Sequence, residues 1–402
     1  MRELEELFVK TYNVNPDYEY VSPARINLIG EHIDYNGGMV LPAAISRYIT
    51  ALVSKRNDNL VSFRSTAFKD TLTRPLDDLA YNTKYDWANY GFGIFYMLQK
   101  EGYKIPFGLN ILITSNIPLG SGLSSSAAFL DLIAYIANDI FKLGLTMDDI
   151  VHKAQATENV YCGLKCGVMD EAAIALGKEN HCLLLNCNTF KYEQVPFDLG
   201  KYKFVVLQTN KPRKLTESKY NERVEECEKS LKLLQNGIKD YKATYLCDYK
   251  SSQLDEIKKV LNDEVLYKRT KHCILEQERV YAFVDALKKG NLKEIGALLK
   301  ASHESLRVDY EVTGLHLDTI VNAALEAGAI GARMTGAGFG GCAIALVDEN
   351  NFDDFKEKVT KKYSSVTGIN PDIYMVDIVS GPRKMRDYKW FMIWLKLLLI
   401  MP

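Results

Sequence analysis

A glycine- and serine-rich loop lies in the first half of the chain and reads Asn116-Ile-Pro-Leu-Gly-Ser-Gly-Leu-Ser-Ser-Ser-Ala-Ala128. It follows a β-rich run at residues 109–115 and precedes a run with helical apolar spacing that extends to Phe141. Small residues let backbone N–H groups approach a ligand closely, and the N-terminus of the following helix favours an anion. The order of strand, loop and helix therefore predicts a phosphate-binding loop, with a plain helix N-cap as the alternative.

Two common nucleotide-binding signatures are excluded. The chain contains no Gly-x-x-x-x-Gly-Lys-Ser/Thr string, so the loop is not a P-loop. A second glycine-rich string, Thr335-Gly-Ala-Gly-Phe-Gly-Gly-Cys342, precedes an apolar strand, whereas a dinucleotide fingerprint needs the order strand, loop, helix. We expect its glycines to allow close approach of the backbone to another segment or to the ligand.

A third stretch concentrates polar side chains near the N-terminus. Arg25, Asn27, Glu31, His32 and Asp34 lie within ten residues, just before a paired-glycine turn and the apolar run that starts at residue 39. This density of hydrogen-bonding groups suits a polyol substrate, whose hydroxyls each need a partner. A solvated surface loop with an ordinary hairpin is the alternative interpretation.

Length and composition favour a globular protein of two or three domains. The 402 residues are 47% hydrophobic and 25% charged, which supplies a sizeable core and excludes intrinsic disorder. A net charge of −1 removes the bulk attraction on which nucleic-acid binding relies. The eight cysteines lack the spacing of a disulfide scaffold or a zinc site, so we expect reduced thiols in a cytoplasmic protein.

The order of strands and helices predicts an α+β protein. Strands are expected near residues 48–54, 60–65 and 109–115, and a capping-box-like start at Thr146 predicts a helix that ends near Cys162. Further strands and charged amphipathic helices follow, without an evident linker. The expected divisions are an N-terminal lobe (1–185), a C-terminal lobe (186–385) and an apolar tail (386–402).

The two ends of the chain carry no recognisable secretory or membrane-spanning pattern. Acidic residues follow Met1 where a secretory signal needs a basic start, and the spacing predicts a short amphipathic helix. The apolar run at residues 390–402 is shorter than the ~20 residues that a membrane span requires. A docked terminal element or an unusual tail is one interpretation of this run, and an interfacial anchor or oligomer contact is the other.

Together, the three stretches resemble the motifs of the GHMP small-molecule kinases, which occur in the same order. Residues 25–42 are similar to the signature of the galactokinases, which usually have glycine where this chain has Ala24. Trp87-Ala-Asn-Tyr90, Cys166-Gly-Val-Met-Asp170 and residues 218–227 are also similar to galactokinase strings, so the resemblance covers nearly the whole chain. The chain departs from the family at Glu171, where glutamine is usual, and in its apolar tail.

The resemblance implies a two-lobed GHMP kinase fold, with an N-terminal mixed sheet covered by helices and a ferredoxin-like α+β C-terminal lobe. It also implies ATP-dependent phosphorylation of α-D-galactose at the C1 hydroxyl, with Mg²⁺. Asp170 matches the family's catalytic base and Arg25 the arginine that orients it, while Ser126 and Glu158 match the metal ligands. The implied sugar-binding residues are Glu31, His32, Ile33, Asp34, Gly167 and Tyr220. The implied ATP-binding residues are Gly120, Ser121, Gly122, Leu123, Ser124, Ser125, Ser126 and Ser65.

Several of these residues also have a purely structural interpretation. Asp170 could cap a helix, Glu158 could be an exposed helix carboxylate, and Ser65 could be an ordinary strand hydroxyl. His32 could act through its backbone alone.

Two alternative functions remain open at this point. A related kinase acting on N-acetylgalactosamine or L-arabinose would differ only in pocket shape. A galactose sensor would bind sugar and ATP and contact a partner without turnover, but the small residues of the loop, with Arg25 and Asp170, favour catalysis. We expect small-molecule partners only, no nucleic acid, no membrane span and a monomer.

Overall fold

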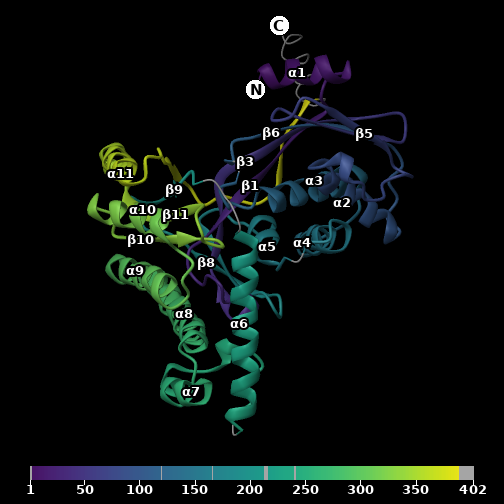
Figure 1. Cartoon of the computed structure of the whole chain (residues 1–402). Helices are drawn as coiled ribbons and strands as arrows, with labels where there is room; N and C mark the ends of the chain where they lie inside the picture. The colour runs from purple at the N-terminus through teal and green to yellow at the C-terminus, as the bar shows by residue number, and fades with distance from the viewer. Residues whose placement is uncertain (1, 119, 165, 212–215, 240, 389–402) are drawn as a thin grey trace.

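The computed structural model describes residues 2–118, 120–164, 166–211, 216–239 and 241–388. The described chain forms an N-terminal lobe of sheet and helices, a second lobe of sheet and helices beside it, and a column of long helices that extends away from both (Figure 1). The predicted two-lobed α+β class is thereby confirmed.

The first lobe is built on a mixed sheet with the strand order β13-β1-β3-β6-β4-β5. Helices α3 and α5 pack on strands β1 and β3, and α2 and α4 pack on α3. On the opposite face, α1 places Leu4 and Phe8 against Leu52 and Leu112. Strand β1 is buried at nine of its ten positions, and it lies between β13 and β3 with α3 and α5 packed on it. The elements of this lobe are α1 (Arg2–Tyr12), β1 (Tyr18–Asn27), β3 (Pro42–Lys55), β4 (Leu60–Ser65), β5 (Thr71–Pro75), α2 (Ala88–Lys100), β6 (Leu109–Ser115), α3 (Ser125–Phe141), α4 (Met147–Ala156), α5 (Met169–Ala175) and β13 (Arg383–Asp387).

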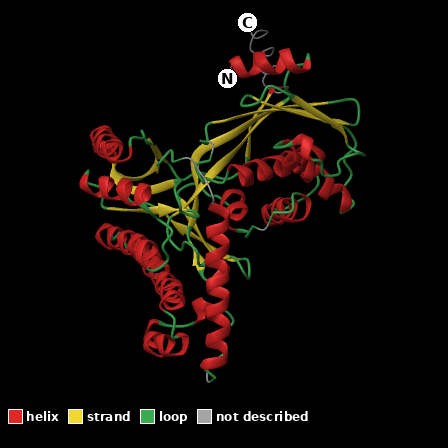
Figure 2. Ribbon diagram, viewed as in Figure 1, coloured by secondary structure: helices red, strands yellow, loops and turns green. Residues whose placement is uncertain are grey.

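The second lobe contains an antiparallel sheet with the strand order β10-β11-β9-β12 (Figure 2). Helices α9 and α10 pack on this sheet, and α11 packs on α10. With the helices between β9 and β10 taken as one unit, the connectivity is βαββαβ, as the predicted ferredoxin-like lobe requires. The elements are β9 (Tyr202–Gln208), α6 (Thr216–Gly237), α7 (Leu254–Leu261), α8 (Glu264–Lys288), α9 (Leu292–Val308), α10 (Leu315–Glu326), β10 (Gly331–Thr335), β11 (Cys342–Asp348), α11 (Phe352–Thr367) and β12 (Asp372–Val376).

A small third sheet, with the order β2-β7-β8, joins the polar N-terminal stretch to the middle of the chain. Its members are β2 (Met39–Val40), β7 (His181–Asn186) and β8 (Lys191–Pro196). Short 3₁₀ turns occur at η1 (Asp34–Asn36), η2 (Thr83–Tyr85), η4 (Leu246–Asp248), η5 (Ser251–Gln253) and η6 (Glu349–Asn351).

The helix that starts at the Thr146 capping box reaches the predicted end near Cys162, but it changes type on the way. The capping box itself is confirmed, because the Thr146 side chain accepts from the Asp149 N–H and the Asp149 side chain accepts from the Thr146 N–H. The α-helix ends at Ala156, and a π-helical turn continues over Thr157–Tyr161, where the Cys162 N–H bonds Thr157 O at 3.0 Å. The Thr157 hydroxyl bonds Lys153 O, a back-bond of the kind that disturbs regular helices.

The lobe boundary near residue 185 stays a prediction. Strand β13, which the prediction assigned mainly to the C-terminal lobe, returns to the first sheet and pairs antiparallel with β1. Residues 389–402, which contain most of the predicted tail, lie outside the described residues. None of the described helices combines the length and apolar character needed to cross a bilayer.

Candidate active site

The sequence stretches singled out above meet around one cavity of about 260 Å³. Both lobes contribute to this lining. It includes the polar stretch at residues 25–34, the start of helix α3, the π-helical turn and the second glycine-rich string. The lining residues are Arg25, Asn27, Gly30, Glu31, His32, Asp34, Ser126, Glu158, Cys166, Gly167, Met169, Asp170, Glu171, Tyr220, Gly336 and Ala337.

Arg25 and Asp170 form a two-pronged ion pair in this cavity. The Arg25 Nε donates to Asp170 Oδ1 and Nη2 donates to Oδ2, both at 2.8 Å. The remaining guanidinium nitrogen, Nη1, donates to Gly122 O at 2.7 Å, so the same arginine also contacts the predicted phosphate-binding loop. The Arg25 side chain is 6% exposed, whereas that of Asp170 is 34% exposed and faces the cavity. The pair therefore presents one fixed carboxylate to a bound molecule.

The loop before helix α3 contacts the same carboxylate. Ser124, the N-cap residue, adopts the left-handed conformation with φ of 60°, and its hydroxyl donates to Asp170 Oδ2. Gly120 and Gly122 also have positive φ, which glycine adopts without steric penalty. The loop is thus shaped by conformations that ordinary side chains disfavour, and it holds the helix N-terminus beside Asp170.

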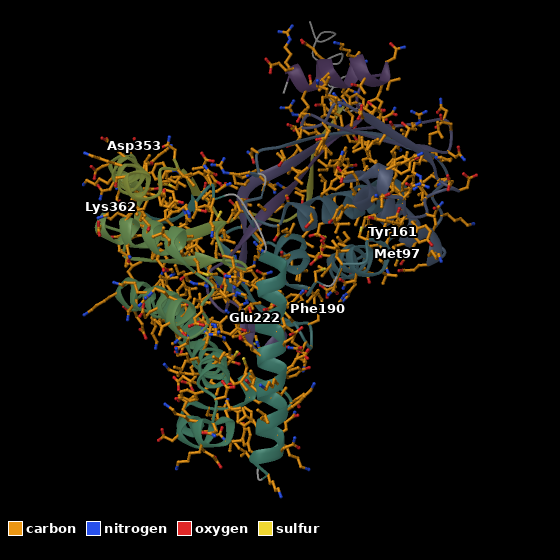
Figure 3. The ribbon with its side chains drawn as sticks, viewed as in Figure 1. Met97, Tyr161, Phe190, Glu222, Asp353 and Lys362 are labelled. Carbon is orange, nitrogen blue, oxygen red and sulfur yellow. The ribbon has the colours of Figure 1, made fainter. Side chains whose placement is uncertain are left out.

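Glu158 reaches the cavity from the π-helical turn. Only 8% of the residue is exposed, so it is not the exposed helix carboxylate of the alternative interpretation. The Tyr161 hydroxyl at the end of the turn donates to Leu79 O at 2.7 Å, and the Tyr161 ring (labelled in Figure 3) lies 5.2 Å from the ring of Tyr96 on helix α2. Anchoring of this turn from two sides fixes the direction in which Glu158 points.

Glu31 connects the two lobes beneath the cavity. Its Oε2 forms an ion pair with the fully buried Arg333 at 2.5 Å and accepts from Asn27 Nδ2 at 2.7 Å. Its Oε1 accepts from the Gly336 N–H at 2.8 Å and lies 3.1 Å from Thr335 Oγ1. Burial raises the pKa of Glu31, and Arg333 opposes that rise. A direct sugar contact by Glu31 stays a prediction, and it requires a sugar hydroxyl to replace one of these donors.

Close backbone contacts explain why the second glycine-rich string, Thr335–Cys342, is rich in glycine. Thr335 Oγ1 donates to Asn27 O at 2.9 Å, and a Cβ at Gly336 would lie 3.5 Å from Gly122 O. A Cβ at Gly338 would lie only 2.3 Å from Val312 O. The predicted close approach of this backbone to a second segment is therefore confirmed.

His32 is held as a neutral ring. Its Nδ1 lies 2.9 Å from the Tyr35 hydroxyl and its Nε2 lies 3.2 Å from Ala337 O, and the residue has φ of 63°. Burial lowers the pKa of His32 to about 3, with a further contribution from His272. The uncharged ring therefore connects the polar stretch to the second glycine-rich string through hydrogen bonds.

We expect the neutral state of His32 to persist throughout the physiological pH range. In an NMR titration between about pH 5 and 8, the ring proton resonances of His32, assigned with an H32Q variant, should not move, because the folded-state pKa lies below this window. A titration midpoint near the ordinary value of about 6.5 would contradict the buried, uncharged ring.

Asp34 faces the cavity opposite Asp170. Burial raises the pKa of Asp34 to about 6, and the negative charge of Asp170 adds to the rise. A Cβ at Gly167 would lie 3.6 Å from Asp34 Oδ2, so the glycine leaves the carboxylate accessible from the cavity. Tyr220 of helix α6 lines the same space.

Several residues of the predicted site lie outside the cavity lining, namely Ile33, Ser65 and the loop residues from Gly120 to Ser125. Ile33 is fully buried in the core, and its carbonyl accepts from the N–H groups of Asn36 and Gly38. Ser65 ends strand β4, and its hydroxyl accepts from the Ala67 N–H at 3.2 Å. Of the loop residues, Ser126 is part of the lining. The roles of Ile33, Ser65 and the remaining loop residues in ligand binding stay predictions.

Sequence reasoning missed a group of residues that support the site from behind. Arg333 donates to Leu28 O at 2.8 Å besides pairing with Glu31. The Gly30 N–H donates to Glu276, and His272 Nε2 lies 3.0 Å from Glu31 O. Arg333 lies just before the second glycine-rich string, but nothing in the sequence indicates that it pairs with the buried Glu31. Glu276 and His272 lie on a long charged helix, where such residues are usually exposed.

Comparison with known proteins places the chain in a family. Family models match residues 6–55 as a galactokinase galactose-binding signature, residues 89–178 as a GHMP kinases N terminal domain and residues 283–365 as a GHMP kinases C terminal domain. A galactokinase of Clostridium tetani is 45% identical over 383 residues, which cover 95% of this chain and 97% of that protein. The chain belongs to the galactokinase family. A galactokinase of Clostridium beijerinckii is 44% identical, over 95% of this chain and 98% of that protein.

Solved structures agree with this family membership. The crystal structure of Lactococcus lactis galactokinase complexed with galactose has a TM-score of 0.89 at 41% identity and covers 96% of this chain and 99% of that one. Methanococcus jannaschii mevalonate kinase, at 20% identity, has a TM-score of 0.67 over 90% of this chain and 98% of that one. The second likeness shows the shared fold alone. The family models and the galactokinase relatives make this enzyme a kinase of the GHMP type.

Proposed function

We propose that this enzyme transfers the γ-phosphoryl group of ATP to the C1 hydroxyl of α-D-galactose, giving galactose 1-phosphate and ADP. The observation that carries the proposal is the fork of Arg25 on Asp170, which sits between the loop at the start of α3 and the polar stretch around Asp34. A sugar hydroxyl and a nucleotide phosphate placed in these two regions meet at the Asp170 carboxylate.

Asp170 acts as the base in this proposal. Phosphoryl transfer depends on positioning and on stabilisation of spread negative charge more than on covalent help from the protein. The Asp170 carboxylate accepts the C1 hydroxyl proton, while the O–P bond forms and the bond to the ADP oxygen breaks. The permanent charge of Arg25, 2.8 Å from both carboxylate oxygens, holds the base in one orientation and offsets negative charge nearby.

The residues present also fit a magnesium ion, which ATP-dependent kinases require to neutralise phosphate charge. The Ser126 hydroxyl and the Glu158 carboxylate line the same cavity, and one or two protein oxygens suffice for Mg²⁺ because it keeps several waters and takes the rest from phosphate. Glu158 lacks an arginine or lysine partner among the described side chains, so its charge is available to a cation. The Ser124 hydroxyl is engaged by Asp170 and is the poorer candidate.

The sugar-binding role of Asp34 predicts a selective loss of affinity. Replacing Asp34 by alanine removes a buried acceptor, and hydrogen bonds to charged groups contribute about 1.5–3 kcal/mol each. Galactose affinity measured calorimetrically without nucleotide should therefore fall about 10–150-fold, while ATP affinity stays nearly unchanged. The S65A variant is a control that should leave galactose affinity unchanged. Equal galactose affinities in D34A and the unmodified enzyme would contradict the role.

Release of ADP tests the proposed reaction directly. The purified enzyme is supplied with ATP and Mg²⁺ and with galactose, N-acetylgalactosamine, L-arabinose, glucose or mevalonate in turn. Galactose should give by far the fastest release, and the product should carry phosphate at C1. Faster release with another sugar would replace galactose as the substrate. Absence of release with every sugar, combined with a galactose-dependent rise in melting temperature, would favour a sensor.

A further inference from the structure

Glu158, Cys166 and Glu171 bring three metal-ligating groups together at the floor of the cavity. One oxygen of each glutamate and the Cys166 Sγ all lie within 4.8 Å of one another. Cys166 Sγ is 3.1 Å from Glu158 Oε2, and all three residues line the cavity. No local sequence pattern marks this cluster, because its residues come from the π-helical turn, the following loop and helix α5.

Glu171 is buried among other acidic groups. The residue is 0% exposed, and among the described residues no N–H or basic group donates to its carboxylate oxygens, whose hydrogen-bonding neighbour is the Glu158 carboxyl group. A buried carboxylate in this state is strongly unfavourable unless it carries a proton or binds a cation. Burial raises the pKa of Glu171 well above its ordinary value, with Asp170 adding to the rise, as expected for a group that lacks a positive neighbour.

The charge around the cluster is unbalanced as well. Asp131 of helix α3 is also 0% exposed, and among the described side chains it has no charged partner, although the Ala175 backbone faces it. Among the described side chains, none of the basic groups forms an ion pair with Asp131, Glu158 or Glu171, whereas Asp170 has Arg25. Three carboxyl groups therefore share a region in which only a bound cation or protons could compensate their charge.

We propose that Glu158, Glu171 and Cys166 form a binding site for one thiophilic divalent cation of the Zn²⁺ class, which is occupied without nucleotide. Zn²⁺ accepts two carboxylates and one thiolate as ligands, and its binding displaces to solvent the proton that the Cys166 thiol donates to Glu158 Oε2. Three protein ligands leave the fourth tetrahedral position open. All three ligands line the cavity, so this fourth position faces the region assigned to substrate. The site shares Glu158 with the proposed magnesium position, and in that respect rests on the proposed function, so Zn²⁺ and the magnesium–nucleotide complex compete for it.

Zinc affinity in the absence of sugar and nucleotide tests the ligand set. Competition with a chromophoric zinc chelator should show one equivalent bound by the unmodified enzyme, and E171Q and C166S should each weaken the affinity by at least about tenfold. D131N is the matched control for E171Q, because it removes a buried charge near the cluster without removing a ligand; it should change the affinity less than either ligand variant. Equal affinity in E171Q and the unmodified enzyme, or an equal loss in D131N, would overturn the proposal.

Cadmium spectroscopy tests the thiol contribution separately. Cd²⁺ bound to a cysteine sulfur gives an ultraviolet charge-transfer band, which should appear in the unmodified enzyme and disappear in C166S. Cys162 is the matched control, since it is also half-buried and lies four residues away but outside the cluster. The band should persist in C162S. Its persistence in C166S would overturn the proposal, and neither measurement depends on phosphoryl transfer, so failure of the galactokinase reaction would leave both readouts intact.

Discussion

Replacing Asp170 by asparagine should lower kcat by about 10²–10⁴-fold while galactose and ATP still bind. The amide keeps the shape of the side chain, and its oxygen can still accept from Arg25, so the fold of the cavity is retained. It cannot accept the proton of the C1 hydroxyl. Steady-state kinetics should therefore show the loss in kcat, with calorimetric galactose affinity close to that of the unmodified enzyme.

A variant of the neighbouring serine separates proton transfer from orientation of the base. S124A removes the hydroxyl that donates to Asp170 Oδ2 but leaves both Arg25 contacts in place. We expect its kcat to fall much less than that of D170N. A D170N enzyme with the kcat of the unmodified enzyme would remove Asp170 from the role of base, and equal losses in the two variants would assign the effect to loop geometry.

Local elements of the fold were predictable because their signals are local. The strand at residues 60–65, the strand at 109–115 and the helix that ends at Phe141 occur where periodicity placed them. The end of the Thr146 helix near Cys162 was predicted, but its change from α-helix to π-helix at Thr157 was not, because neither the Thr157 back-bond nor the π-helical turn alters the apolar spacing. The return of β13 to the first sheet depends on pairing with a strand more than 350 residues away, and no local pattern encodes it.

The candidate site likewise contains residues that could be predicted from the sequence and residues that could not. Arg25 and Asp170 stood out through strings that resemble a family, and the structure brings them into contact although they are 145 residues apart. The resemblance also implied a sugar-binding role for Ile33, but this side chain is fully buried in the core. Arg333 could not be recognised, because its importance comes from complete burial against Glu31. Burial of a charge is a property of the assembled lobes and not of any sequence window.

Replacing Arg333 by methionine should lower the free energy of unfolding by about 3–5 kcal/mol, the usual effect of removing one partner from a buried ion pair. Arg333 is 0% exposed and its Nη2 lies 2.5 Å from Glu31 Oε2. Its loss leaves the Glu31 charge in a site from which water is excluded, and leaves Leu28 O without its donor. Urea denaturation of the apo enzyme measures the change.

The same substitution on the surface provides the control. Arg307 pairs with Glu304 at 2.6 Å, but the two side chains are 46% and 60% exposed, so R307M should cost no more than about 1 kcal/mol. Adding E31Q to R333M removes the stranded charge, and the double variant should be more stable than R333M alone even though both groups of the pair are lost. If R333M lost no more stability than R307M, the buried pair would not be what joins the polar stretch to strand β10. If the double variant were less stable than R333M, the neutral hydrogen bonds of Glu31, rather than its charge, would account for the loss.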